Sequence, residues 1–403
     1  MTDDGVCLNQ RTHSSLHDIR PHVKEAYAKW YDRNYPWSRW DPMLPEVHQM
    51  SQPQLAVWHH TTRWGNSSCS LWLPTEDEEK ESQCATGPGF FPPPNPHVQP
   101  TRTLVGNFGF YTTWFTGHYG HFNHDYLPSL AYMRAVTRSA YGNNTAKFIL
   151  VDFERCRELV QFMDPDFYKR VEWIQFDEVV KIDGEITYLT PQSIPQNAGH
   201  ALMSHLRQWL TEAHPFDAAD FHTHQHILYY DRVGSNAVNH GRVLDADQQW
   251  QILVTIRAAM EKYGLANQEL VLFNGHNKQG ETLSPAEQFQ LFRRASTIIG
   301  PHGTGISNMV WTNPNPQGCE ARTQLLEFVP GPDVADVQGI YAGYYRSFRG
   351  LPIDYHELFY QLPSTNSKTF ISLTELENAL DVMWSGKQII HVEESVLSLS
   401  KVS

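Results

Sequence analysis

The chain has 403 residues, which is long enough for two domains with separate hydrophobic cores. Its 31 Lys and Arg and 44 Asp and Glu residues give a net charge of −13, so we expect neither a nucleic acid nor an anionic membrane as partner. The 5 cysteines show no metal-binding spacing, and their odd number leaves the redox compartment and the disulfide state open.

The beginning of the chain is polar, with the sequence Met1-Thr2-Asp3-Asp4. Nowhere does the chain contain an apolar run of about 18 residues, the length needed to span a bilayer. We therefore expect neither a signal peptide nor a membrane segment in this chain.

In the first half of the chain, helices and strands are predicted only after residue 100. Residues 1–100 have no clear periodicity and include an acidic and proline-rich stretch over 74–100. After that stretch, hydrophobic periodicity predicts a helix over 128–138, strands over 147–151 and 171–176, and a helix over 199–212. The segment 215–220 has the composition of a linker between domains.

Strands and helices alternate clearly in the second half. The pattern predicts strands over 227–230, 269–273, 297–299 and 325–329, and helices over 247–263, 285–295 and 372–384. Such alternation is typical of an α/β fold with a parallel sheet wound on both faces. We expect an N-terminal domain over residues 1–215, a C-terminal domain over 221–370, and a final helix and tail over 371–403 that crosses back to the first domain.

A glycine-rich turn follows the predicted strand at 297–299. It reads Gly300-Pro301-His302-Gly303-Thr304-Gly305, and a helix is expected to begin near Ile306. The helix before the strand has a strong start, Ser284-Pro285-Ala286-Glu287. A glycine turn between a strand and a helix lets a ligand approach the backbone and points free N–H groups at an anion. The alternative is an ordinary turn whose glycines serve only geometry.

Three further groups of residues are candidates for a site. His121 and Asp125 lie four residues apart, on one face if the segment is helical, as a general base and its partner would; the alternative is a helix-capping Asp and core histidines. His222, His224 and His226 alternate along a strand as zinc ligands do, but they lack a carboxylate partner at a fixed spacing.

The third group follows the first strand of the C-terminal half. Arg232 lies at the carboxyl end of that strand, where ligands bind in open α/β sheets, and its guanidinium is suited to a diphosphate. Arg242 is suited to the same ligand or to pairing with Asp245 or Asp247. For Asp245 we favour the role of helix cap, with Gln248 completing a capping box.

These segments resemble the glycosyltransferase family 61 proteins, which include plant xylan arabinosyl- and xylosyltransferases and animal O-linked N-acetylglucosaminyltransferases. The family pattern G-x-H-G-A-G-L-T-N, followed by a strand that ends in Glu before Pro, is matched at Gly300–Asn308 and at Leu325–Pro330 over roughly 45 residues. Thr304 replaces the usual Ala. Residues 117–128 are similar to the N-terminal family pattern, with His118 in place of Asn.

The resemblance implies a GT-B fold, in which two Rossmann-like domains face each other across a cleft. It implies an inverting, metal-independent transfer of a sugar of the xylose, arabinose or N-acetylglucosamine class from UDP to a hydroxyl of a glycan or glycoprotein, without a cofactor. Asp125 is then the base and His121 its partner. The donor is bound by Arg232, His302, Gly303, Thr304, Gly305, Asn308 and Glu327, with Glu327 accepting hydrogen bonds from the ribose.

Family members usually carry an anchor and act in the Golgi or the endoplasmic reticulum. The resemblance therefore implies a lumenal enzyme if an anchor is missing from this chain, and otherwise a soluble cytoplasmic one. Two alternatives share the fold: a nucleotide-sugar epimerase and an inactive sugar-binding homologue. A histidine-site metallohydrolase is the alternative from another class.

Overall fold

A computed structural model of the chain forms two compact units, one of residues 42–215 and one of residues 1–41 and 216–403. The structure describes residues 11–13, 47–60, 66–72, 99–111, 119–142, 146–175, 178–189, 200–215, 226–233, 244–312, 323–330, 351, 353–360 and 370–385. The two units are described separately.

The unit of residues 42–215 contains two sheets. The first is five-stranded, in the order β2 (Val47–Ser51), β10 (Glu185–Leu189), β6 (Phe108–Phe110), β7 (Lys147–Val151) and β8 (Val171–Ile174); only β2 is antiparallel to its neighbour. The second is four-stranded, in the order β4 (Asn66–Trp72), β3 (Gln54–His60), β9 (Val179–Asp183) and β5 (Arg102–Val105). Buried side chains of both sheets, such as Leu55, Leu104 and Ile149, form one core.

Helices pack around these sheets. They are α2 (Tyr119–His121), the π-helical turn η2 (Phe122–Tyr126), α3 (Leu127–Tyr141), α4 (Glu154–Met163), α5 (Pro165–Tyr168) and α6 (His200–Ala213). The first three run on continuously, and α3 packs against α6. Side chains of α6 that point inward, such as Met203, Leu206 and Trp209, are almost fully buried.

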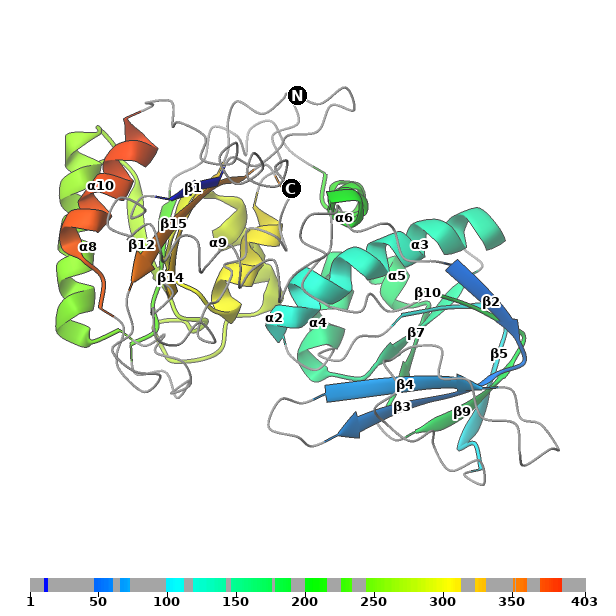
Figure 1. The fold of residues 1–403 in the computed structure, drawn as a ribbon. Helices are drawn as coiled ribbons and strands as arrows, with labels where there is room; N and C mark the ends of the chain where they lie inside the picture. Colours follow the sequence, from blue (N-terminus) through cyan, green and yellow to red (C-terminus); the bar gives the residue numbers. More distant parts are fainter. Residues whose placement is uncertain are drawn as a thin grey trace, which may run out of the picture. The chain divides into compact units, whose positions relative to one another are not determined.

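The other unit is built on one parallel sheet (Figure 1). Its strand order is β1 (Arg11–His13), β15 (Ile353–Tyr360), β14 (Thr323–Pro330), β13 (Ala295–Pro301), β11 (His226–Tyr230) and β12 (Glu269–Phe273). Every pair in this order is parallel. Counted from β11, the strands follow the doubly wound order 2-1-3-4-5, with the topological switch point between β11 and β13.

Helices cover both faces of this sheet. Helices α8 (Ala246–Lys262) and α10 (Leu373–Trp384) pack together and cover one face, where they bury Ile299, Leu326 and Phe328 among others. Helix α9 (Pro285–Arg293) and the 3₁₀ helix η3 (Thr304–Trp311) pack against each other, and α9 contacts β11. Glu327 alternates with Leu326 and Phe328 along β14, so its side chain lies on the face opposite α8 and α10.

The structure confirms the α/β class and most of the predicted elements. Strands β7 and β12 have the predicted bounds, and the predicted capping box at Ser284 and Glu287 starts α9. The helix after the glycine turn is a 3₁₀ helix that begins at Thr304, two residues before the predicted start. In the part of the chain that the structure describes, no helix is long and apolar enough to cross a membrane.

Candidate functional site

Arg232 and the glycine turn meet at the switch point of the parallel sheet. Arg232 follows the carboxyl end of β11, and the turn follows the carboxyl end of the neighbouring strand β13. The Nη1 of Arg232 donates a hydrogen bond of 2.7 Å to the carbonyl oxygen of His302. Its guanidinium lies 5.9 Å from the ring centroid of Tyr230, and the residue is only 8% exposed. Among the described residues, the buried Nε of Arg232 has no hydrogen-bond partner.

The glycines of the turn make room for this arginine and for Tyr230. A Cβ on Gly303 would lie 2.3 Å from Arg232 Nη1, and a Cβ on Gly305 would lie 2.3 Å from the ring of Tyr230. Both distances are shorter than real Cβ contacts, so any larger residue would displace the side chain beside it. The turn therefore holds its backbone against the guanidinium, as an anion site formed by both requires.

His302 is paired with a buried carboxylate. Its Nδ1 lies 2.5 Å from Oε1 of Glu327, and its main-chain N–H donates to the carbonyl oxygen of Phe328 at 2.9 Å. The hydroxyl of Tyr355 donates to Oε2 of the same carboxylate. Glu327 is fully buried, while the side chain of His302 is 13% exposed. A carboxylate on Nδ1 fixes the orientation of an imidazole and directs the chemistry of the ring to Nε2.

Sequence reasoning missed Tyr355 and Glu357. Both are buried on β15, and Glu357 stands directly opposite Glu327 in the register of the sheet. The available signal was an alternation of apolar and ionisable residues over Ile353-Asp354-Tyr355-His356, typical of a strand with two different faces, which Glu357 interrupts.

The Asn308 side chain and the Ile306 main-chain N–H form hydrogen bonds with other groups of the protein. Asn308 is 1% exposed; its Nδ2 donates to Oε1 of Gln288 at 2.7 Å, and its Oδ1 accepts from Trp311 Nε1 at 3.3 Å. These bonds attach η3 to α9. The N–H of Ile306 donates to the carbonyl oxygen of Gly303 at 2.9 Å, so the amides that begin the 3₁₀ helix are those of Thr304 and Gly305.

The second candidate group lies where α2 passes into η2. His121 ends α2 and Asp125 lies within the π-helical turn; the structure places their backbone but does not describe their side chains. Between them, Asn123 and His124 are buried, and Tyr126 donates to the carbonyl oxygen of Tyr111 at 2.7 Å. A single π-helical turn inside an α-helix is often a feature of functional sites.

The remaining sequence candidates have structural roles or lie outside the described residues. His226 is buried at the start of β11, and burial lowers its pKa; its Nδ1 is 4.0 Å from a carboxylate oxygen of Glu269. His118, His222, His224 and Arg242 lie outside the described residues. Where the structure describes the chain, no three His, Cys, Asp or Glu side chains gather as a metal site would require.

The predicted cap of α8 is half right. Asp245 caps the helix by accepting from the N–H of Asp247 at 3.0 Å. Gln248 does not complete a capping box: its amide instead donates to the carbonyl oxygen of Ile371 at 2.9 Å. This buried partner comes from a segment distant in sequence, which local spacing does not reveal.

The sequence of the chain matches the model of a known protein family. The family model of glycosyltransferase 61 matches residues 119–319. This segment runs from α2 through the glycine turn and includes Arg232. The chain belongs to the glycosyltransferase 61 family. It is therefore a glycosyltransferase, an enzyme with a sugar donor and an acceptor as substrates. No curated protein matches the chain.

Proposed function

We propose that this glycosyltransferase 61 protein is an inverting, metal-independent enzyme of GT-B architecture. It moves a sugar of the xylose, arabinose or N-acetylglucosamine class from UDP to a hydroxyl of a glycan or glycoprotein. The observation that carries the proposal is the contact of Arg232 with the glycine turn at the switch point of a parallel sheet. Open α/β sheets bind nucleotides at such points.

The donor diphosphate lies between Arg232 and the start of η3. The guanidinium offers its buried Nε, and the helix offers the N–H groups of Thr304 and Gly305 and the positive end of its dipole. Hydrogen bonds to charged groups contribute about 1.5–3 kcal/mol each. Three or four of them would match the contribution of a cation, which supports transfer without a metal.

His302 donates from Nε2 to an oxygen of the departing diphosphate. We assign Glu327 to His302 instead of to the ribose, because its two oxygens are engaged by His302 and Tyr355. A buried carboxylate on Nδ1 stabilises a positive charge on the ring as negative charge develops on the leaving group. Asn308 acts by holding η3 against α9.

Asp125 is the general base, and His121 orients it or relays the proton. As the acceptor oxygen attacks the anomeric carbon, its proton passes to Asp125, and the bond from that carbon to the diphosphate breaks with its electron pair going to UDP. Attack on the face opposite the leaving group inverts the configuration. The family also supports a site of action in the lumen of the Golgi or the endoplasmic reticulum.

The proposal is tested by thermal unfolding with UDP in the presence of EDTA. A ligand at 100 times its dissociation constant stabilises a protein by about 2.7 kcal/mol, which gives a readily measured shift. We expect the shift in the unmodified protein and its loss in Arg232→Ala. The matched control is Arg257→Ala, which removes an exposed arginine from α8. A UDP shift that requires Mn²⁺, or that survives in Arg232→Ala, would reject the proposed donor site.

A further inference from the structure

Tyr230, the last residue of β11, lies against three glycines of the glycine turn. A Cβ on Gly300 would lie 2.7 Å from the Cβ of Tyr230. Farther out along the same side chain, a Cβ on Gly303 would lie 3.0 Å from Cε1, and a Cβ on Gly305 would lie 2.3 Å from Cε2. The backbone of the turn therefore follows the shape of this one tyrosine, whose ring reaches from Gly303 to Gly305.

The hydroxyl of Tyr230 lies beside the start of η3. The ring atom that carries this hydroxyl, Cζ, would be 2.7 Å from a Cβ on Gly305. Because η3 begins at Thr304, the phenol oxygen lies next to the backbone whose first amides are proposed to bind the diphosphate. A hydrogen-bond donor in this position is suited to the negative charge of that group.

Two further side chains hold the ring of Tyr230. The guanidinium of Arg232 lies 5.9 Å from the ring centroid, and the ring of Phe273 lies 6.1 Å from it. Tyr230 is partly exposed, whereas the neighbouring Tyr229 is fully buried. Among the residues that the structure describes, none forms a hydrogen bond with the Tyr230 hydroxyl. A phenol that is held by packing and keeps its donor for a ligand is preorganised for binding.

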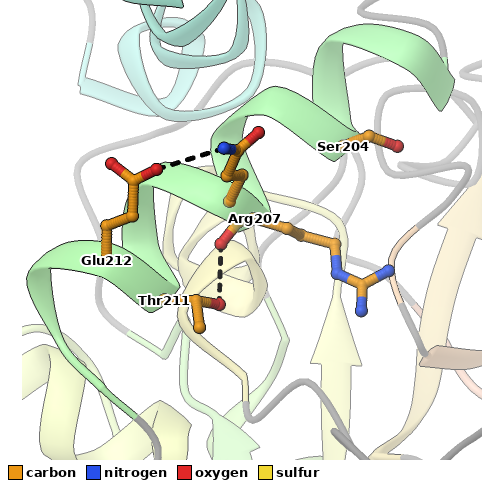
Figure 2. A pocket seen from close by; sticks show the side chains of 5 residues that line it. Ser204, Arg207, Thr211 and Glu212 are labelled. Carbon is orange, nitrogen blue, oxygen red and sulfur yellow. Dashed lines mark hydrogen bonds between the residues drawn. The ribbon is translucent and has the colours of Figure 1, made fainter.

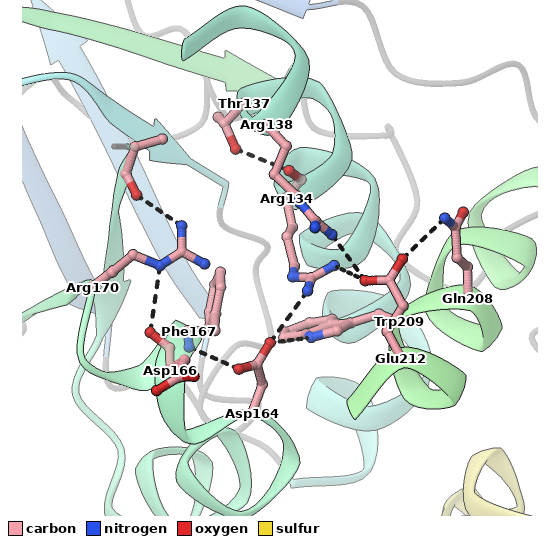
Figure 3. A network of polar contacts seen from close by, with 11 residues as sticks. Arg134, Thr137, Arg138, Asp164, Asp166, Phe167, Arg170, Gln208, Trp209 and Glu212 are labelled. Carbon is pink, nitrogen blue, oxygen red and sulfur yellow. Dashed lines mark hydrogen bonds and ion pairs between the residues drawn. The ribbon is translucent and has the colours of Figure 1, made fainter. Parts of the chain in front are cut away.

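The polar groups along α6 differ from the Tyr230 hydroxyl, because they are bonded within the protein. In the hollow along this helix, the Thr211 hydroxyl donates to a main-chain carbonyl oxygen of α6 at 2.9 Å (Figure 2). Glu212 accepts hydrogen bonds from Arg134 at 3.0 Å and from Arg138 at 2.9 Å (Figure 3). These bonds join α6 to α3, so the groups that form them have a structural role.

We propose that the Tyr230 hydroxyl donates a hydrogen bond to an oxygen of the donor diphosphate, while the ring supports the glycine turn. The inference rests on the proposed function, since it adds a contact to the proposed donor site. When the bond from the sugar to the diphosphate breaks, its electron pair goes to UDP, and negative charge grows on the phosphate oxygens. The hydrogen bond from the phenol strengthens as this charge develops.

Tyr230→Phe tests the contact, because it removes the hydroxyl and keeps the ring against the glycines. We expect UDP affinity to fall about 10–100-fold, the effect of losing one hydrogen bond to a charged group. The affinity for uridine, which lacks the diphosphate, should not change. Calorimetric titration of UDP and NMR titration of uridine, both in EDTA, measure the two affinities. The midpoint of thermal unfolding without ligand should also stay the same.

The matched control is Tyr263→Phe. It removes the hydroxyl of another partly exposed tyrosine of the same unit, which donates to Oδ1 of Asp381 at 2.8 Å and joins α8 to α10. We expect this variant to bind UDP and uridine as the unmodified protein does. A loss of UDP affinity of the same size in Tyr263→Phe would overturn the inference, because the loss would then not be specific to Tyr230.

Gly305→Ala provides a comparison that keeps the hydroxyl. Gly305 does not have a positive φ, so its backbone conformation is open to alanine. The added methyl would lie 2.3 Å from Cε2 of Tyr230, so the ring and its hydroxyl must move. We expect UDP affinity to fall by about the same factor as in Tyr230→Phe. If Tyr230→Phe does not fold, Gly305→Ala decides, and normal UDP affinity in that variant would overturn the inference.

The outcomes separate this inference from the proposed function. Normal UDP affinity in Tyr230→Phe, together with its loss in Arg232→Ala, would overturn the contact and leave the proposed donor site intact. An equal loss of UDP and uridine affinity would also overturn it, because the hydroxyl would then contact the nucleoside or support the fold. An unmodified protein that binds no UDP in EDTA would reject the proposed donor site and the contact with it.

Discussion

At the scale of single residues, the proposed donor site depends on close packing between the backbone of the glycine turn and the guanidinium of Arg232. Gly303 has no space for a Cβ beside Arg232, whereas Thr304, the next residue, is partly exposed. The sequence pattern identified both residues but did not reveal that they differ in this way. The difference arises because Arg232 reaches the turn from another strand.

Gly303→Ala therefore tests the site without removing a charge. The added methyl displaces Arg232 Nη1, and we expect UDP affinity to fall about 10–100-fold, the effect of losing one charge-assisted hydrogen bond. Calorimetric titration of UDP measures this loss. The control is Thr304→Ala, which installs the residue usual in the family pattern and should bind UDP normally. Normal affinity in Gly303→Ala would show that Arg232 does not contact the donor.

Glu327→Gln tests whether the carboxylate works through His302. The amide keeps the shape of the side chain but cannot stabilise a positive charge on the ring. We expect transfer to slow by about 10²–10⁴-fold at neutral pH, as for other general acids and bases, with much of the loss recovered under more acidic conditions. The pH dependence of kcat measures this. A loss in kcat that does not change with pH, together with weaker UDP binding, would favour a ribose contact for Glu327.

At the scale of elements, the local sequence was sufficient to predict a helix or strand that is bounded by its own capping or turn residues. Helix α9 was found from Ser284 and Glu287, and β12 from an apolar run between turn residues. Strand β15 was missed because Tyr355, His356 and Glu357 make it polar in sequence although all three are buried. Their burial is decided by pairing with β14, about 30 residues earlier in the chain, and local periodicity does not contain that information.

His356 makes the stability of this strand dependent on pH. It lies on the face that α8 and α10 cover, and burial lowers its pKa from 6.5 to about 4. Between these values the unfolded chain binds a proton that the folded chain excludes, so stability decreases as the pH falls. The free energy of unfolding should drop by about 2 kcal/mol between pH 7 and pH 5 from this group. Denaturant unfolding at the two pH values measures this drop, and in His356→Gln it should be smaller by that amount. An equal drop in the variant and the unmodified protein would show that His356 is not the group responsible.

The π-helical turn η2 carries the candidate base, so Asp125→Asn is the variant that tests this element. We expect folding and UDP binding to be retained and transfer to fall by about 10²–10⁴-fold, because the acceptor hydroxyl loses its base. Asp183→Asn, an exposed change on β9, is the control. Near-normal turnover would reject Asp125 as the base, and a protein that no longer folds would favour the role of helix cap.

At the scale of the whole molecule, the sequence predicted the α/β class and the parallel sheet of the unit formed by residues 1–41 and 216–403. The strand order could not be predicted from the sequence. This order positions the candidate site, because β11 lies beside β13 and Arg232 therefore contacts the glycine turn. The net charge of −13 excludes broad attraction to polyanions, so the proposed binding of a nucleotide-sugar donor requires local cations such as Arg232.

UDP is proposed to bind where β11 and β13 end, and amide hydrogen exchange with and without UDP measures whether it does. In EDTA, UDP should slow exchange in peptides covering residues 226–233 and 300–312, and Arg232→Ala should abolish that protection. Protection that is absent from both segments, or that appears only elsewhere in the chain, would show that UDP does not bind at this edge of the sheet.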